Sequence, residues 1–146
     1  MNRERIGTDL QDTLIELTDL ALQAKQLHWN VTGPTFLSVH AQLDALTDEA
    51  RAAGDAVAER AVALGQPADG RVGIVAKETP LPEAPDGRLH TAAVIAHTVR
   101  VLDIVIERTR TRIDQLDSVD LVTQDLLIGI VAGLEKQRWM FDAQQA

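Results

Sequence analysis

Two histidines and three carboxylates lie at helical spacings in the first half of the chain. His28 precedes a Gly-Pro break and His40 follows it, while Asp44 is four residues beyond His40 and Glu59 is four beyond Asp55. Residues four apart lie on the same face of a helix. Imidazole and carboxylate together suit iron, zinc or manganese, and the chain has no cysteine that would add a softer ligand. These residues predict a metal site, and iron is the metal we expect.

The spacing along the chain separates the five residues into two groups. If residues 36 to 63 form one helix, Asp44 and Asp55 differ by about 20° around its axis but by roughly 16 Å along it. Metal–ligand bonds of about 2 Å cannot span that distance in one centre. A second copy of the helix, antiparallel about a two-fold axis near Glu49 and Ala50, would bring the acidic pair of one chain to the histidine and aspartate of the other. The sequence therefore predicts two equivalent sites at a dimer interface.

The stretch that carries these residues resembles the Dps family of mini-ferritins. The resemblance rests on HWNVTGPTFLSVHAQLD, residues 28 to 44, and on DAVAER, residues 55 to 60, and it extends through nearly the whole chain. It implies that iron is bound by His28, His40 and Asp44 of one subunit and by Asp55 and Glu59 of its two-fold mate. Taken singly, such a histidine is more often a core residue and such a carboxylate is more often solvated. Five of them in one register favour the metal site.

The resemblance also implies an architecture and an activity. The architecture is all-α, a ferritin-like four-helix bundle with a long crossover carrying a short helix, and it assembles into a hollow homododecamer. The activity is that of a ferroxidase. Two Fe(II) ions bind at each inter-subunit site, hydrogen peroxide accepts their electrons, and ferric mineral is stored inside the shell. Removing ferrous iron and peroxide together protects the cell against oxidative damage.

Several further residues have both a functional and a structural interpretation. Trp29 adjoins the first histidine and could quench radicals or shield the iron from solvent, or it could serve packing alone. Asp120 and Asp125 lie near the start of the last helix, where acidic residues of the family line three-fold pores that admit ferrous ions. The same carboxylates would equally favour the helix dipole at that end. Lys25 and Arg60 are expected to order the metal-binding carboxylates.

Apolar periodicity predicts four long helices and one connector within a single domain, residues 1 to 146. The helices are expected over about Thr8 or Asp9 to His28, Thr35 to Leu64, Leu89 to Leu116 and Asp120 to Ala143. Residues 1 to 7 are expected to be too short and polar to pack. The connector, residues 65 to 88, holds the remaining four prolines, and Val72 to Lys77 within it is apolar enough for a short helix. A connector of this length joins two parallel helices at opposite corners of a bundle.

The apolar residues of the last two long helices predict which of their faces are covered. On the first of these helices, Val94, Val101 and Val105 form a second apolar strip that we expect neighbouring subunits to cover. On the second, the inward residues are expected to be Val122, Leu126, Gly129, Gly133, Leu134 and Met140. No repeated carboxylate pattern accompanies His90 or His97, so both are expected to have structural or surface roles.

The charge of the chain favours a protein that handles cations over one that binds nucleic acid. The formal net charge is -8 over 146 residues, which repels phosphate and concentrates cations. DNA binding, which the family name suggests, is the competing hypothesis. Members that bind DNA commonly use lysine-rich tails, whereas this chain has only Arg3 and Arg5 before its expected first helix and no cation in its C-terminal DAQQA. We therefore do not expect direct DNA binding.

The sequence lacks the signals of membrane insertion and of the larger ferritins. It has no run of about 18 apolar residues and no charged-then-apolar leader, so we expect a cytoplasmic protein with no membrane partner. None of the four histidines has a glutamate three residues earlier, which is the pairing of intrachain di-iron bundles. The expected substrates are ferrous iron and hydrogen peroxide, and the expected partner is a second copy of the chain.

Overall fold

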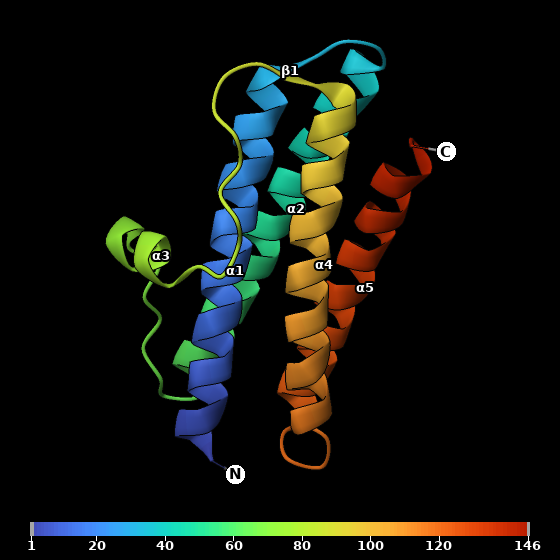
Figure 1. Cartoon of the computed structure of the whole chain (residues 1–146). Helices are drawn as coiled ribbons and strands as arrows, with labels where there is room; N and C mark the ends of the chain where they lie inside the picture. The colour runs from blue at the N-terminus through green and yellow to red at the C-terminus, as the bar shows by residue number, and fades with distance from the viewer. Residues whose placement is uncertain (1, 146) are drawn as a thin grey trace.

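Four long helices lie side by side in a computed structural model that describes residues 2–145 (Figure 1). They are α1 (Arg3–Asn30), α2 (Phe36–Ala63), α4 (Thr91–Gln115) and α5 (Leu121–Ala143). The crossover between α2 and α4 carries the short helix α3 (Val72–Glu78), which lies outside α1. The predicted all-α four-helix bundle with a helix in its long crossover is therefore confirmed.

The first helix begins earlier than the sequence suggests. Asn2 is its N-cap and accepts a hydrogen bond from the backbone N–H of Arg5, so the cap predicted at Thr8 or Asp9 is wrong. The expectation that residues 1 to 7 do not pack is also wrong, because Ile6 is fully buried. Ile6 continues the apolar stripe of α1 by one more turn, and burial of that turn stabilises it as helix.

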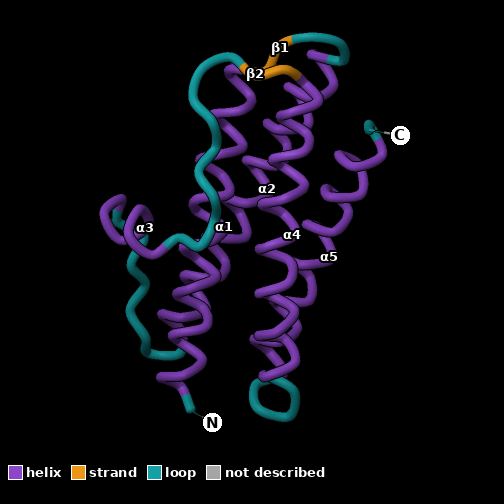
Figure 2. The backbone as a smooth tube through the Cα atoms, in the orientation of Figure 1, coloured by secondary structure: helices purple, strands orange, loops and turns teal. Residues whose placement is uncertain are grey.

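The turn between α1 and α2 is tied to the start of α4. Strand β1 (Val31–Thr32) pairs in parallel with strand β2 (Leu89–His90), as the orange segments of Figure 2 show. Gly33 has a φ of 106°, and a Cβ at this position would lie 2.9 Å from the ring of His90. Glycine is therefore required at this close approach, both for its backbone conformation and for its lack of a side chain.

The crossover is held against α1 by polar contacts. The side-chain amide of Gln11 donates to the carbonyl of Asp69 at 2.8 Å and accepts from the same residue's N–H at 2.9 Å. Further along, the hydroxyl of Thr79 donates to Asp19 at 2.6 Å. These contacts provide hydrogen-bond partners for the backbone of an otherwise irregular segment and keep this segment close to the bundle.

The apolar faces of α4 and α5 differ from the expectation. Val94, Val101 and Val105 are buried inside the chain, so they are not a strip left for neighbouring subunits. On α5, Val122 is 63% exposed and Gly129 is also exposed, so the prediction that these two residues face inward is wrong. The buried residues of that helix are Thr123, Leu127, Val131, Leu134, Gln137 and Phe141. Because α5 is apolar around most of its circumference, its periodicity did not define the inward face.

A buried ion pair that the sequence did not reveal links α1 to α4. Glu16 is only 1% exposed, and its carboxylate accepts from both terminal nitrogens of Arg112 at 2.5 and 3.0 Å. Arg108 adds a third contact to Glu16 at 2.9 Å. A buried carboxylate with paired cations of this geometry fixes how the two helices face each other.

Within residues 2–145, no helix has the length and apolar character needed to span a membrane.

Candidate metal centre

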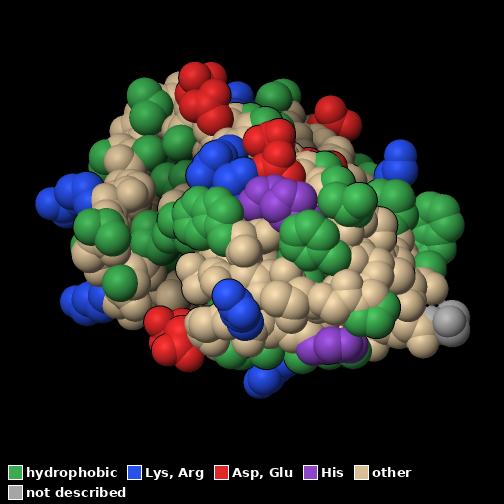
Figure 3. Space-filling view, turned by 90° about the horizontal axis from the view of Figure 1, so that it is seen from above, with side chains coloured by type: hydrophobic (Ala, Val, Ile, Leu, Met, Phe, Trp, Pro, Cys, Tyr) green, Lys and Arg blue, Asp and Glu red, His purple; other side chains and the backbone are tan. Residues whose placement is uncertain are grey.

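His28 and His40 lie against each other at the end of the bundle that holds the α1–α2 turn. His28 is in the last turn of α1 and His40 is in the second turn of α2. Their rings stack with centroids 3.7 Å apart and planes 14° from parallel. In Figure 3, which looks onto this end, one group of histidine atoms lies at the surface with acidic, basic and hydrophobic side chains around it.

Each histidine bonds to the backbone of the other. Nδ1 of His28 lies 2.6 Å from the carbonyl oxygen of His40, and Nδ1 of His40 lies 2.8 Å from the carbonyl oxygen of His28. A carbonyl can only accept, so both Nδ1 atoms must carry the hydrogen. In a neutral ring the Nε2 atom then keeps its lone pair, which is the arrangement a metal-binding histidine needs. The fold thus leaves the Nε2 lone pair of each neutral imidazole outside these two hydrogen bonds.

Asp44 lies one turn beyond His40 and is paired with Lys25 of α1. The hydrogen bond from Lys25 lowers the pKa of the Asp44 carboxyl below its ordinary value, and the charge of Lys25 acts in the same direction. The carboxylate is therefore charged at neutral pH and able to bind a cation. Lys25 thus contacts one of the carboxylates predicted to bind metal, and the metal-binding role of Asp44 stays a prediction.

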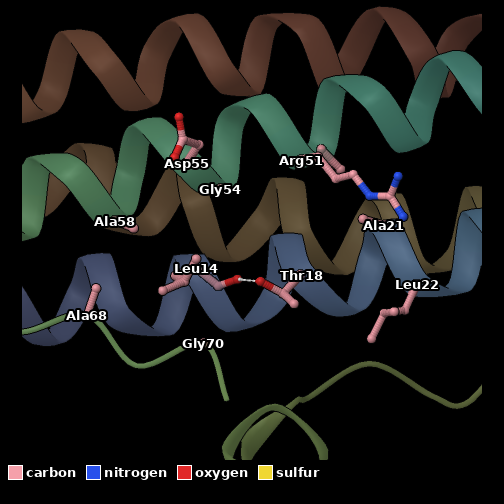
Figure 4. Close-up of a pocket in the computed structure, with 11 residues that line it drawn as sticks. Leu14, Thr18, Ala21, Leu22, Arg51, Gly54, Asp55, Ala58, Ala68 and Gly70 are labelled. Atoms are coloured by element: carbon pink, nitrogen blue, oxygen red, sulfur yellow. Dashed lines mark hydrogen bonds between the residues drawn. The ribbon is translucent and has the colours of Figure 1, made fainter. Parts of the chain in front are cut away.

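Asp55 and Glu59 are exposed on the same helix, farther along its axis. Helix α2 runs without a break from Phe36 to Ala63, so Asp55 is displaced from Asp44 by roughly 16 Å along the axis. Asp55 lines a hollow of about 390 Å³ between α2, α1 and the crossover, which Figure 4 shows in close-up. Much of the lining consists of small or apolar side chains, including Ala21, Leu22 and Ala58.

One chain does not bring the five predicted ligands together. No group of three or more histidine, aspartate or glutamate side chains within residues 2–145 is close enough to hold a metal ion. The structure joins His28 to His40 and places Asp44 with Lys25, while Asp55 and Glu59 stay apart from both. The shared site between two chains remains a prediction.

Asp120 acts as a helix cap. It is 7% exposed, and its carboxylate accepts from the backbone N–H and the hydroxyl of Thr123 at the start of α5. Arg60 donates to both of its oxygens, at 3.1 and 3.3 Å. Burial alone would raise the pKa of Asp120, but the hydrogen bonds from Thr123 and Arg60 outweigh it and lower that pKa. The expectation that Arg60 orders a metal-binding carboxylate is therefore wrong, because Arg60 pairs with this cap.

The remaining candidate residues either are exposed at the surface or form hydrogen bonds within the chain. Asp125 is exposed on α5, and its role in a pore stays a prediction, as does the role of the exposed Trp29 beside the histidines. His90 caps α4 by accepting from the N–H of Ala92. His97 bonds through Nε2 to Gln23 at 2.7 Å, and burial lowers its pKa. The structural roles expected for both histidines are confirmed.

Phe36 is a member of the site that the sequence did not reveal. Its ring packs on that of His40, with centroids 5.0 Å apart and planes 26° from parallel. The two residues are four apart on one helix, which is the spacing that brings side chains into contact. That spacing was visible in the sequence, but an aromatic residue before a histidine is too common to be distinctive.

Comparisons with known proteins identify the family of the chain. Residues 8–146 match the ferritin-like domain family. The DNA protection during starvation protein of Mycolicibacterium smegmatis is 39% identical over 134 residues, covering 92% of this chain and 73% of the relative. DNA protection during starvation protein 2 of Deinococcus radiodurans is 36% identical over 134 residues, covering 92% of this chain and 56% of that longer protein.

Solved structures give the same result. A C-terminal deletion mutant of Mycobacterium smegmatis Dps superimposes with a TM-score of 0.91 at 37% identity, covering 96% of this chain and 97% of the other. Dps from Microbacterium arborescens in the high iron form superimposes with a TM-score of 0.94 at 34% identity, covering 98% and 93%. The bundle and its crossover are thus those of a ferritin-like protein. Within that class, the chain belongs to the Dps family.

Proposed function

We propose that this protein is a ferroxidase and iron-storage mini-ferritin whose active sites are shared between two subunits of a hollow dodecamer. The observation that carries the proposal is the reciprocal bonding of His28 and His40. It holds two imidazole rings side by side and leaves one nitrogen lone pair on each. An ionised aspartate, Asp44, follows one turn later on the same helix. Nitrogen and carboxylate oxygen are ligands that ferrous iron accepts.

The chemistry we propose is the oxidation of ferrous iron, with hydrogen peroxide as the preferred oxidant. Two Fe(II) ions at one site each give one electron to a peroxide molecule, whose O–O bond breaks. With two further water molecules, the products are two ferric oxyhydroxide units and four protons. Because the peroxide takes both electrons at once, no hydroxyl radical is released. The ferric product is stored inside the shell, so iron and peroxide are removed together.

A two-fold partner supplies the remaining ligands in this proposal. Asp44, Arg51 and Asp55 lie within about 40° of one another around the axis of α2, so they share one face of the helix. That face borders the hollow of Figure 4, where the half-buried Ala58 provides little side-chain bulk. A second α2 helix running antiparallel can approach closely there. Asp55 and Glu59 of the partner would then reach the histidines.

Stopped-flow oxidation of Fe(II) tests the activity, with peroxide as the oxidant under anaerobic conditions and, in a separate experiment, with oxygen as the oxidant. The wild-type protein should consume one peroxide for two Fe(II) ions, and faster than it consumes oxygen. His28→Gln should lose most of this rate, while His97→Gln, a matched histidine outside the site, should keep it. Wild-type rates in His28→Gln would overturn the proposed site.

Protection of DNA through direct binding is not part of the proposal. The relatives are named for DNA protection, but the N-terminal cations of this chain are not on a free tail. Arg3 and Arg5 belong to the first turn of α1, and Arg5 contacts Asp9 and Gln115. With a net charge of -8 per chain, the protein offers few cations to phosphates. We propose that it acts in the cytoplasm and protects DNA by removing iron and peroxide.

A further inference from the structure

The ring of His40 has an aromatic neighbour on each face. His28 stacks on it with centroids 3.7 Å apart, and Phe36 stacks on it with centroids 5.0 Å apart. Two rings at these distances cannot lie on the same face of an imidazole without overlapping each other. His40 is therefore held between His28 from α1 and Phe36 from its own helix.

The two kinds of contact restrain different motions of His40. The hydrogen bond from Nδ1 to the carbonyl of His28 fixes one atom of the ring, at 2.8 Å. It leaves the ring free to swing about that atom, because the side-chain torsion next to an imidazole is broad. A ring packed on the second face prevents this swing and keeps the two planes stacked. The direction of the Nε2 lone pair is then set by both contacts together.

We propose that Phe36 is a positioning residue of the metal site, acting through the plane of the His40 ring. The inference rests on the proposed function, because it assumes that His40 binds metal. Phe36 touches no metal in this proposal. It keeps the plane of the His40 ring fixed beside His28, and with it the direction in which the Nε2 lone pair of His40 is offered to a metal ion. Side chains that orient a metal-binding histidine typically change metal affinity by about 10 to 100-fold when they are replaced.

A purely structural role for Phe36 predicts a different outcome. Phe36 is the first residue of α2 and is 38% exposed, so it could serve only to start the helix or to cover apolar surface. Any apolar side chain of similar volume would then suffice. The positioning role instead requires a flat ring, and a flexible or branched aliphatic side chain would not replace it.

Titration of the assembled protein with Co(II), monitored by visible absorption, separates the two roles. The shape and intensity of the cobalt bands depend on the geometry of the ligands, and Co(II) takes nitrogen and oxygen ligands as ferrous iron does. Phe36→Leu should lower the Co(II) affinity about tenfold and change the bands. Phe36→Tyr, which keeps the flat ring, should restore both to within a factor of about two. Leu37→Ala, an exposed neighbour on the same turn, serves as the control and should behave as wild type.

The variants are compared by size-exclusion chromatography and thermal unfolding before titration. If Phe36→Leu does not assemble, Phe36→Met replaces it, since methionine fills a similar volume without a flat face. Unchanged cobalt affinity and bands in the aliphatic variant would overturn the positioning role and leave the metal site standing. Wild-type cobalt binding that persists in a His28→Gln, His40→Gln double variant would instead overturn the proposed metal site itself.

Discussion

Mixing two inactive variants should restore part of the ferroxidase activity. One variant has His28, His40 and Asp44 replaced, and the other has Asp55 and Glu59 replaced. Each variant alone should be a poor ferroxidase, because every one of its sites lacks ligands. Helix α2 is continuous over its 28 residues, so the two groups of ligands stay roughly 16 Å apart within a chain. They can meet only across two chains.

The fraction of activity that should return follows from how the two variant chains pair into dimers. In a mixed dimer, one site collects both sets of substitutions, and the other takes its histidines from the second variant and its acidic pair from the first. The latter site is complete. If chains pair at random, about half of the dimers are mixed and half of their sites are complete, so roughly a quarter of the wild-type activity should return.

Co-expression with two different affinity tags provides the assay. Two successive purifications select assemblies that contain both variants, and mass spectrometry gives the proportion of each chain. The rate of Fe(II) oxidation by peroxide is then measured per subunit. As a control, the separately purified variants are mixed after assembly, when subunits can no longer exchange pairs. No recovery in co-expressed, verified mixtures would refute the shared site and favour a site within one chain.

Four further predictions concern stability, uptake and DNA. Asp120→Ala should lower the free energy of unfolding by about 2 kcal/mol, because α5 loses its cap and Arg60 loses its partner. The pKa of Asp120 is lowered in the folded protein, so the stability that its carboxylate contributes is fully present above the ordinary aspartate pKa. This stability is lost as the pH falls through the pKa of Asp120 in the folded protein. The denaturation curves of Asp120→Ala and wild type should therefore converge in acid. Glu16→Gln should cost about 3 kcal/mol in the same assay, because Arg112 is left buried without its counter-charge. Asp125→Asn should slow oxidation at low Fe(II) in stopped flow while leaving the rate at saturating Fe(II) unchanged, if a ring of these carboxylates concentrates cations. The assembled, metal-free protein should not retard plasmid DNA in a gel at about 0.15 M salt, because it offers few cations to neutralise phosphates.

Each of these has an outcome that would contradict it. Equal stability of Asp120→Ala and wild type at neutral pH would show that the cap is dispensable. A Glu16→Gln protein as stable as wild type would mean that Arg112 finds another partner. Unchanged oxidation in Asp125→Asn at low Fe(II) would remove Asp125 from the uptake route. Retarded DNA in a chelator-treated sample would contradict the charge argument.

The sequence predicted the four long helices better than it predicted which of their faces are buried and which residues cap them. Long stripes such as that of α2 fix a helix and its inward side together, because only one face is apolar. The nearly uniform α5 allowed no such inference, and Val122 was assigned to the wrong side. Arg60 adjoins Glu59 in sequence, yet it bonds to Asp120, which is 60 residues away. Contacts between distant segments depend on the assembled fold, which local periodicity does not contain.

The unbroken course of α2 restricts how this gene can change in length. One residue inserted or deleted between Asp44 and Asp55 would turn the second acidic pair by about 100° relative to the first group. In a shell built on shared sites, that single event would disable every site at once. Insertions near Gly65 or Gly87 should have far milder effects, because both residues lie on the connector and a side chain there would meet nothing within 4 Å. Related chains should therefore vary in length in the connector and keep a constant count of residues within α2.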